Sequence, residues 1–270
     1  MVENKLLMKR STQKIHNKIL KLAKFLYRIQ APLKIPNIFQ IMTNYFCFFI
    51  DLKRYKSREG SEKIELANLM PCIFDKTPVT QINFHYFYQD TWAARKIFEN
   101  KPRYHVDIGS TALFVGILSQ FTKVCSVDIR PLPVKIEGLE LKSGSLLNLP
   151  FSDGELESVS SLCVIEHIGL GRYGDELDPK GTDKAISELI RVLGIGGNLY
   201  ISVPIDEKTR VYYNAHRSFS YDDFITKVKD LWLIEVKFIH GKRIYSIEEI
   251  RSIDLTKEWA VGLFHFRKNK

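Results

Sequence analysis

The stretch Tyr104-His-Val-Asp-Ile-Gly-Ser-Thr-Ala-Leu-Phe-Val-Gly116 predicts a buried strand that turns sharply into a helix. Val106 and Ile108 form a short apolar run around the acid Asp107, and Gly109 then lets the backbone turn beneath a ligand. The helix after such a turn directs free N–H groups and a partial positive charge at whatever lies above it. The stretch is therefore typical of a nucleotide-cofactor site.

The segments that follow alternate between strand and helix. Strand-like runs fall over residues 103–109, 123–129, 139–143, 156–164 and 198–203, and helical patterns fall near 112–122 and 182–193. Such alternation implies parallel strand pairing in a three-layer α/β domain. The last two apolar runs, 233–239 and 261–266, are separated by a long insertion and have no helix after them, which suggests an antiparallel pair at the edge of the sheet.

The positive charge of the chain belongs to its N-terminal part. The 270 residues carry a formal net charge of +9, but residues 1–60 hold 13 Lys and Arg against 3 Asp and Glu, so the rest of the chain has a net charge of −1. This length suits one large domain behind an extension. We therefore expect a basic amphipathic helical extension over residues 1–69 and a Rossmann-like domain over residues 70–270.

The extension contains two amphipathic stretches. Residues 14–29 place apolar side chains at helical spacing with lysines on the other faces, which predicts a basic helix. Residues 38–50 are aromatic and apolar, are too short and too polar to span a bilayer, and precede the basic cluster Lys53, Arg54, Lys56 and Arg58. Two interpretations stay open: a helix packed on the domain, or a peripheral anchor at an anionic membrane surface. No recognised nucleic-acid module is present, so we expect no nucleic-acid partner.

The cysteines and the N-terminus indicate a compartment. The four cysteines, Cys47, Cys72, Cys125 and Cys163, lie far apart without C-x-x-C spacing, so we expect reduced thiols and no structural zinc. The first residues lack the apolar core and the cleavage site of a signal peptide. These features favour a cytoplasmic protein, with peripheral membrane association left open and no metal site expected.

A helix predicted over residues 85–97 is rich in polar aromatic side chains. His85, Tyr86, Tyr88 and Trp92 are costly to bury without partners. We expect some of them to line a cleft, and we take Tyr88 as the candidate for substrate binding. A helix packed at the sheet edge with its hydroxyls at the surface is the alternative.

A second acid, Asp128, ends the strand 123–129 and lies 19 residues after Gly109. In doubly wound folds an acid at this point accepts hydrogen bonds from both ribose hydroxyls of an adenosine cofactor. Asp128 alone is equally consistent with a residue that caps the next turn. Together with the turn at Asp107-Ile-Gly109, it favours an adenosine cofactor.

Later motifs carry a resemblance to a known superfamily. Leu149-Pro-Phe-Ser-Asp153 precedes the strand 156–164, Ile165-Glu-His167 follows it, and Arg191-Val-Leu-Gly-Ile-Gly-Gly197 precedes the next strand. Over about residues 101–268, this order resembles the class I S-adenosylmethionine-dependent methyltransferases. The segments His105–Ser110, Gly169–Asp175 and Asn214–Arg217 further resemble a methyltransferase-like family of unknown function, often associated with surface-glycan synthesis. The likeness implies a mostly parallel seven-stranded sheet with an antiparallel edge strand.

The resemblance also implies S-adenosylmethionine as the cofactor and a set of contacts to it. These are Asp107, Gly109 and Ser110 in the first turn, Asp128 at the ribose, Ser145 and Leu146 near the adenine, and a floor from Cys163 to Glu166 beneath the sulfonium. Two features depart from the family pattern. Thr111 and Leu113 stand where the family usually has glycine, and Ser145 replaces a common acid.

Candidate catalytic residues follow the predicted fourth strand. Methyl transfer is an in-line displacement, so the protein aligns the reactants and, for a hydroxyl acceptor, supplies a base. Glu166 and His167 lie at the carboxyl end of the strand, where ligands of open α/β sheets bind. His167 is the first candidate for the base because its unperturbed pKa is near neutrality, although it is as consistent with a residue that only holds the following loop. His216 is the second candidate.

Three further residues are candidates for acceptor binding: Arg172, Asn214 and Arg217. Either arginine is equally consistent with a surface salt bridge. The sequence thus predicts a methyltransferase that acts on a hydroxyl of a sugar or glycan intermediate. The alternative is a non-catalytic methyltransferase-like scaffold that has lost cofactor binding. A dehydrogenase is disfavoured, since the chain lacks G-x-G-x-x-G.

Overall fold

A computed structural model describes residues 37–269, and the chain divides into two compact units, residues 1–81 and 82–270. The basic helix predicted at residues 14–29 lies outside the described residues. The division predicted between residues 69 and 70 stays a prediction.

The described part of the first unit is built around one long helix, α2 (Ile38–Lys56), followed by the short 3-10 helix η2 (Leu66–Asn68). Helix α2 begins where the side chain of Asn37 accepts a hydrogen bond from the N–H of Phe39, which satisfies one of the free N–H groups of the first turn. No residue of α2 is buried. Among the described residues, no helix is both long and apolar enough to cross a membrane.

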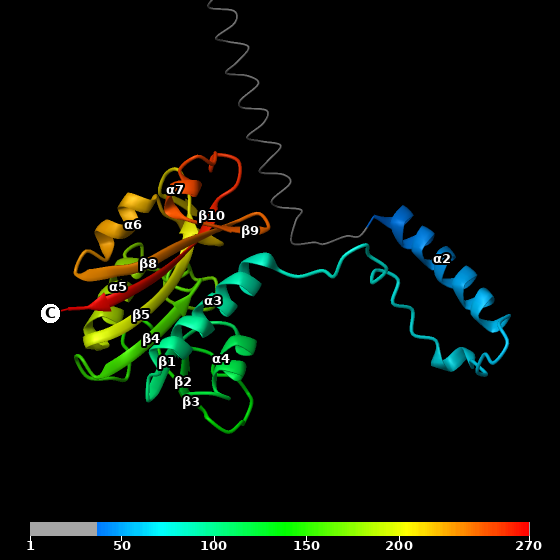
Figure 1. Ribbon diagram of the computed structural model, residues 1–270, viewed down its shortest axis with the longest axis horizontal. Coiled ribbons are helices and arrows are strands. Elements are labelled where there is room, and N and C mark those ends of the chain that lie inside the picture. The colour runs from blue at the N-terminus through cyan, green and yellow to red at the C-terminus, as the bar shows by residue number, and fades with distance from the viewer. Residues whose placement is uncertain (1–36, 270) are drawn as a thin grey trace, which may run out of the picture. The chain divides into compact units, whose positions relative to one another are not determined.

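The second unit is organised around an eight-stranded sheet (Figure 1). In spatial order its strands are β3 (Leu139–Ser143), β2 (Lys123–Asp128), β1 (Tyr104–Ile108), β4 (Leu156–Leu162), β5 (Leu193–Ile205), β10 (Ala260–Lys268), β8 (Leu231–His240) and β9 (Arg243–Tyr245). The first five strands are parallel to one another. Strand β10 runs antiparallel to both β5 and β8. The predicted fold class is confirmed, and short β9 adds an antiparallel edge strand to the seven that were expected.

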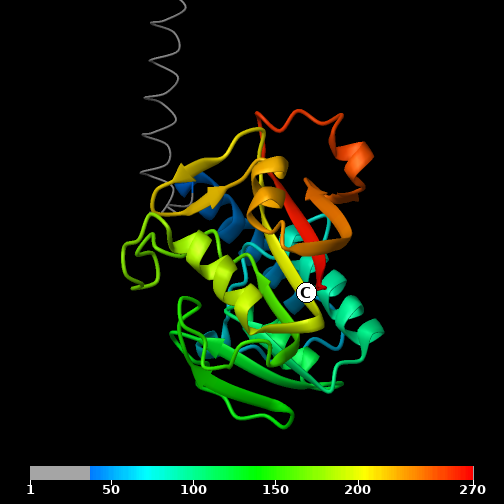
Figure 2. The same ribbon diagram turned by 90° about the vertical axis from the view of Figure 1, so that its left-hand side faces the viewer.

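Helices cover both faces of this sheet and complete three layers (Figures 1 and 2). On one face, α3 (Phe84–Asn100) and α4 (Ala112–Leu118) pack in one apolar core; on the other, α5 (Gly181–Val192) and α6 (Tyr221–Lys227) pack in a second core. Successive strand residues alternate between the two cores: Tyr200 belongs to the first and Ile201 to the second. This alternation is the two-residue period of a strand that is covered on both sides.

Several boundaries differ from the sequence-based predictions. Helix α4 ends at Leu118 rather than near residue 122. Strand β4 ends at Leu162, because Cys163 has a positive φ of 55° that breaks the extended backbone. Strand β5 begins at Leu193 instead of residue 198. A two-stranded ribbon of β6 (Arg210–Tyr212) and β7 (His216–Ser218), and the short helix α7 (Ile247–Ile250), were not predicted.

Candidate functional site

The turn after β1 passes tightly between the ends of β2 and β4. Gly109 has a φ of +71°, and its N–H donates to the carbonyl of Val127 at 3.0 Å. A Cβ on Gly109 would lie 3.0 Å from Cγ1 of Val164 and 3.8 Å from Oδ2 of Asp128. A side chain there would be both strained and crowded. The predicted turn residue, the acid that ends β2 and the loop after β4 are therefore brought together at one edge of the sheet.

Asp107 uses its carboxylate to hold this turn. The side chain is fully buried and accepts hydrogen bonds from the N–H of Ser110 (3.1 Å), from Oγ of Ser110 (2.6 Å) and from Oγ of Ser160 (2.5 Å). Burial raises the pKa of Asp107 to about 6, and these hydrogen bonds oppose that rise. Oγ of Ser110 also accepts the N–H of Leu162 at 3.1 Å. Both predicted cofactor residues thus fix the backbone on which a cofactor would lie.

Thr111, one of the residues that replace a family glycine, has a structural role. It is the N-cap of α4, where its Oγ1 accepts the N–H of Phe114 at 3.3 Å. The same hydroxyl donates to Oδ2 of Asp90 on α3 at 2.9 Å. Leu113, the other replacement, is 72% exposed. The altered turn therefore starts one helix and ties it to another.

The side chains of the three residues predicted at the ribose and adenine have different partners within the fold. Oδ1 of Asp128 accepts the N–H of Arg130 at 2.7 Å, so this carboxylate does cap the next turn while it faces Gly109. Oγ of Ser145 accepts the N–H of Leu147 at 3.2 Å. The side chain of Leu146 is packed in the core. A contact between Leu146 and an adenine would therefore come from its backbone.

Cys163 lies at the end of β4 and is bound by helix α3. Its Sγ donates to Oε1 of Gln89 at 3.0 Å, and Oγ of Ser202 donates to the same oxygen at 2.6 Å. Burial raises the pKa of the Cys163 thiol. Gln89 is fully buried, and its Nε2 donates to Oδ1 of Asp90 at 3.1 Å. These contacts hold α3 against the ends of β4 and β5.

Sequence reasoning missed Gln89 and Asp90. One signal was present: Gln89 lies three, four and eight residues before Trp92, Ala93 and Ile97, so an amide occupies the apolar stripe of a helix. A polar side chain in such a stripe needs a buried partner.

Glu166 is a buried acid with an unsatisfied oxygen. Its side chain is 1% exposed, and its Oε2 has no hydrogen-bond partner among the described residues. Burial raises the pKa of Glu166 to about 8, while the neighbouring thiol of Cys163 and the charge of Arg172 act in the opposite direction. At neutral pH the side chain is therefore mainly a neutral acid that can donate a hydrogen bond.

His167 is a neutral base held beside this acid. Its Nδ1 lies 2.6 Å from the carbonyl oxygen of Ala215, which assigns the proton to Nδ1. Its Nε2 then carries the lone pair and lies 3.8 Å from Oε1 of Glu166. Burial lowers the pKa of His167 to about 4, against the effect of the Ala215 carbonyl. At neutral pH both side chains are thus uncharged: His167 carries its proton on Nδ1, and Glu166 carries the proton of its carboxyl group.

A series of aromatic rings, which we call the aromatic row, leads from α3 past His167. Its successive ring centroids are separated by 5.2, 5.4, 6.4 and 5.5 Å along the order His85, Trp259, His216, His167 and Tyr173. The guanidinium groups of Arg130 and Arg172 lie 4.6 and 5.0 Å from the Tyr173 ring centroid. Both histidines that were predicted as catalytic candidates therefore belong to the aromatic row. Trp259, Tyr173 and Arg130 also belong to this surface, and the sequence analysis did not predict them as site residues.

The residues predicted to bind an acceptor separate into two groups. Arg172 is exposed and donates to the carbonyl of Ala215 at 3.0 Å, next to His167, and Asn214 is exposed in the same ribbon turn. Arg217 is 8% exposed and donates to the carbonyl of Ile168 (2.6 Å) and to Oγ1 of Thr182 (3.1 Å). Its guanidinium thus holds the loop after β4 from inside.

Tyr86 and Tyr88 both belong to α3, and their hydroxyls have different surroundings. The assignment of Tyr88 to substrate binding stays a prediction. The hydroxyl of Tyr88 donates to the carbonyl of Lys242, in the turn between β8 and β9, at 3.0 Å. Burial raises the pKa of Tyr86, and the nearby acidic groups of Cys163 and Glu166 act in the same direction. Tyr86 is therefore the tyrosine of α3 that lies near the buried acid.

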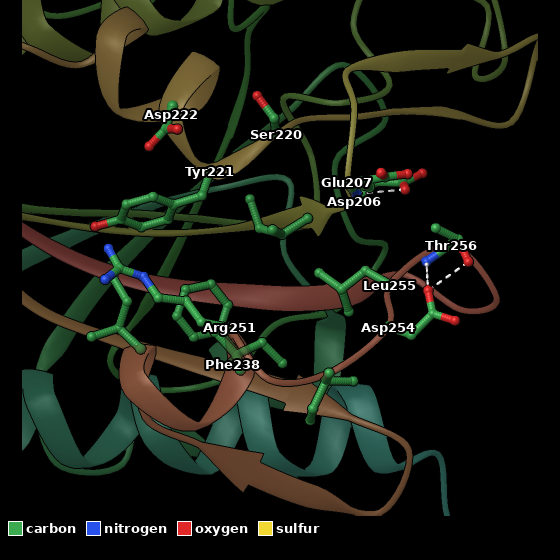
Figure 3. Close-up of a pocket in the computed structure, with 14 residues that line it drawn as sticks. Asp206, Glu207, Ser220, Tyr221, Asp222, Phe238, Arg251, Asp254, Leu255 and Thr256 are labelled. Carbon is green, nitrogen blue, oxygen red and sulfur yellow. Dashed lines mark hydrogen bonds between the residues drawn. The ribbon is translucent and has the colours of Figure 1, made fainter.

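A separate cavity of about 470 Å³ lies at the ends of β5 and β8, beside α6 (Figure 3). Its floor includes the buried side chains of Ile205, Phe238 and Ile250. Asp206 in its wall accepts a hydrogen bond from the hydroxyl of Tyr212 at 3.2 Å, and the Tyr212 ring packs 5.1 Å from that of His216. Tyr212 of β6 thus contacts both a residue that lines this cavity and a member of the aromatic row. None of the predicted site residues lines the cavity.

Comparison with known proteins gives a short family match. A family model described as "Caenorhabditis protein of unknown function, DUF268" matches residues 141–223, which is less than half of the chain. This segment contains Cys163, the Glu166–His167 pair and His216. A comparison with functionally curated proteins finds no significant match.

Solved structures give low-identity likenesses. N-methyltransferase NodS from Bradyrhizobium japonicum WM9, in complex with S-adenosylhomocysteine, is 16% identical, with 82% of this chain and 97% of that chain covered at a TM-score of 0.48. The Burkholderia thailandensis 1,6-didemethyltoxoflavin-N1-methyltransferase is 13% identical (69% and 84% covered, TM-score 0.49). The [4+2]-cyclase SpnF is 10% identical (67% and 79% covered, TM-score 0.49). Likeness at this level establishes neither a cofactor nor a reaction for this chain.

Proposed function

We propose that this chain is an S-adenosylmethionine-dependent methyltransferase that acts on a hydroxyl of a sugar or glycan intermediate. One observation carries the proposal: the glycine turn after β1, the acid at the end of β2 and the buried Glu166–His167 pair after β4 all converge on the carboxyl edge of a parallel sheet. That edge is where ligands of open α/β sheets bind.

The residues at this edge fit the cofactor. Gly109 allows close backbone approach, as its positive φ and crowded Cβ position require. Asp128 would accept hydrogen bonds from the ribose hydroxyls, Ser145 and the backbone of Leu146 would lie beside the adenine, and Cys163 would lie beneath the sulfonium. When bound, S-adenosylmethionine supplies a methyl group on an electrophilic sulfonium.

The chain's own contribution is to orient the acceptor and to take up its proton. The hydrogen bond from Nδ1 of His167 to Ala215 fixes the ring and leaves Nε2 as the proton acceptor. A base in this position typically contributes 10²–10⁴ to the rate. Burial keeps the imidazole uncharged until the acceptor proton arrives, and neutral Glu166 lies 3.8 Å from that nitrogen. Ionisation of Glu166 would favour the imidazolium and so strengthen the base.

The aromatic row supports a cyclic, hydroxyl-rich acceptor. Apolar and aromatic surface with a few fixed polar groups is typical of small-molecule sites. The Trp259 ring would cover the apolar face of a sugar, while Tyr86, Arg172 and Asn214 offer polar contacts at its rim. His216, between Trp259 and His167, would orient the acceptor.

We further propose that the extension, residues 1–60, brings this site to an anionic membrane surface.

The experiment is a transfer assay with S-adenosylmethionine that carries a labelled methyl group. Acceptors would include free sugars, nucleotide sugars and lipid-linked sugars, with formation of S-adenosylhomocysteine as the readout. We expect label in a sugar hydroxyl, and none with His167→Gln. If the protein binds the cofactor and methylates only non-sugar acceptors, the glycan part of the proposal is wrong. If it binds no cofactor, the scaffold alternative replaces the enzyme.

A further inference from the structure

Helix α2 carries a continuous apolar stripe that the described protein leaves open. We call the stripe the α2 stripe; its members are Ile38, Phe39, Met42, Tyr45, Phe46 and Phe49, which are 40–74% exposed. At about 100° per residue they cover roughly 120° of the helix circumference. An apolar patch of this extent on a surface marks an interaction site.

The opposite side of α2 is the one tied to the rest of its unit. Asp51 and Tyr55 lie on that side, where Lys76 donates to Oδ2 of Asp51 at 3.0 Å and the hydroxyl of Tyr55 bonds the carboxylate of Glu62. The partly buried residues Asn44 and Phe48 share this side. The segment after the helix is thus bound to one face of α2, while the α2 stripe faces outward.

Positive charge continues the α2 stripe toward the C-terminal end of the helix. Lys53 follows Phe49 by four residues and Lys56 by seven, so both lie on the same side as the stripe. Arg54 borders them, and the one acid of the helix, Asp51, lies on the other side. An apolar stripe that runs into cations complements a surface with an apolar interior and anionic head groups.

We infer that α2 is a peripheral membrane anchor whose α2 stripe enters the lipid boundary while Lys53 and Lys56 contact anionic head groups. This inference rests on the membrane part of the proposed function and assigns it to α2 rather than to residues 14–29. It is independent of methyl transfer. Helices of this kind lie in the plane of the interface and bury their apolar face by about 5–10 Å.

The test is co-sedimentation of the full chain with phosphatidylcholine vesicles that contain or lack phosphatidylserine. The stripe variant is Met42→Glu with Phe46→Glu. The matched control is Gln40→Glu with Cys47→Glu, which changes the charge of the same helix equally at two exposed positions outside the stripe. Circular dichroism of both variants checks that the helix content is kept.

We expect the control to bind phosphatidylserine vesicles like the unchanged chain and the stripe variant to bind at least tenfold more weakly. Lys53→Gln with Lys56→Gln should weaken binding to these vesicles about thirtyfold, because each of the two cations near such a surface contributes about 1 kcal/mol. Equal binding by stripe variant and control would overturn the assignment to α2. If binding is equal but is lost on removal of residues 1–36, the membrane proposal stands and the anchor lies there. Self-association through the stripe without vesicle binding would identify a second copy of the chain as the partner and overturn the inference.

Discussion

The two halves of the sheet's carboxyl edge use their buried polar groups differently. At the β1 end, Asp107 accepts three hydrogen bonds from serines, and Thr111 caps a helix and binds Asp90. At the β4 end, Glu166 is equally buried, yet its Oε2 has no partner among the described residues and its pKa is raised to about 8. The buried acid of the first half is satisfied within the fold, whereas that of the second half keeps an oxygen without a partner among the described residues.

This difference indicates where substitutions should affect chemistry and where they should affect binding or stability. A polar group satisfied within the fold contributes to geometry, whereas a buried acid with a strongly shifted pKa is typical of a functional site. We therefore expect changes near β4 to alter rate and pH dependence, and changes near β1 and β2 to alter affinity or folding.

The largest effect is expected for His167→Gln. Loss of the base should lower kcat by about 10²–10⁴, while the affinity for S-adenosylmethionine stays unchanged, because His167 lies on the acceptor side. Steady-state kinetics with a calorimetric titration of the cofactor would measure both quantities.

His216→Gln is the matched variant for this measurement. His216 contacts the rings of Trp259 and His167, so its loss should mainly raise KM for the acceptor. The reverse pattern would exchange the two roles. Normal turnover in both variants would mean that alignment alone drives the transfer.

Glu166→Gln should change the pH dependence of both stability and rate. The pKa of Glu166 is about 8 in the folded protein and about 4.5 in the unfolded chain. Because the unfolded state releases this proton first, the unchanged protein loses stability as pH rises from 4.5 to 8, by an amount on the order of a few kcal/mol, and levels off above. The variant should lack this loss in urea unfolding at pH 5 and pH 9. Because ionised Glu166 would strengthen the base, kcat of the unchanged protein should rise near pH 8, and kcat of the variant should not. If stability and kcat depend on pH in the same way in both proteins, Glu166 is not a buried acid with a raised pKa.

Asp128→Ala should weaken S-adenosylmethionine binding by roughly 1.5–3 kcal/mol, the scale of hydrogen bonds to a charged group. The domain should stay folded, since the one hydrogen bond that the Asp128 side chain makes to the described residues is from the N–H of Arg130. Calorimetry measures the affinity. Unchanged affinity in a folded variant would leave Asp128 as a turn residue and move the cofactor site elsewhere.

The smallest effect is expected for Thr111→Ala. Loss of the N-cap should lower the free energy of unfolding by about 1 kcal/mol, measured in urea, with cofactor affinity within about twofold. A large loss of affinity at full stability would show that the first half of the edge contributes directly to binding.

The fold was largely predictable because its signals are local. The alternation of apolar runs and helical patterns gave the parallel strands and their helices, and the two final runs do pair antiparallel as β8 and β10. The three-residue strands of the ribbon β6–β7 carry too short a pattern to recognise. The length of strand β4 was overestimated because nothing in the sequence indicates that Cys163, which is not a glycine, adopts a positive φ.

The residues that gather at this edge of the sheet were predictable where a motif marks them and not where packing decides, and their functional roles stay predictions. Gly109, Asp128 and the Glu166–His167 pair were found from their positions after strands. Tyr86, which lies near Glu166, was not assigned from the sequence because the sequence does not show which side of α3 meets the sheet. Trp259 is far from the other site residues along the chain, and only the pairing of β10 with β5 brings it beside His216.

The most direct test of the central claim is calorimetric titration of the purified protein with S-adenosylmethionine and, separately, with NAD. The account predicts saturable binding of S-adenosylmethionine that Asp128→Ala weakens, and no binding of NAD. Binding of NAD alone would indicate a different cofactor site. If neither ligand binds, the account is contradicted and the non-catalytic scaffold is favoured.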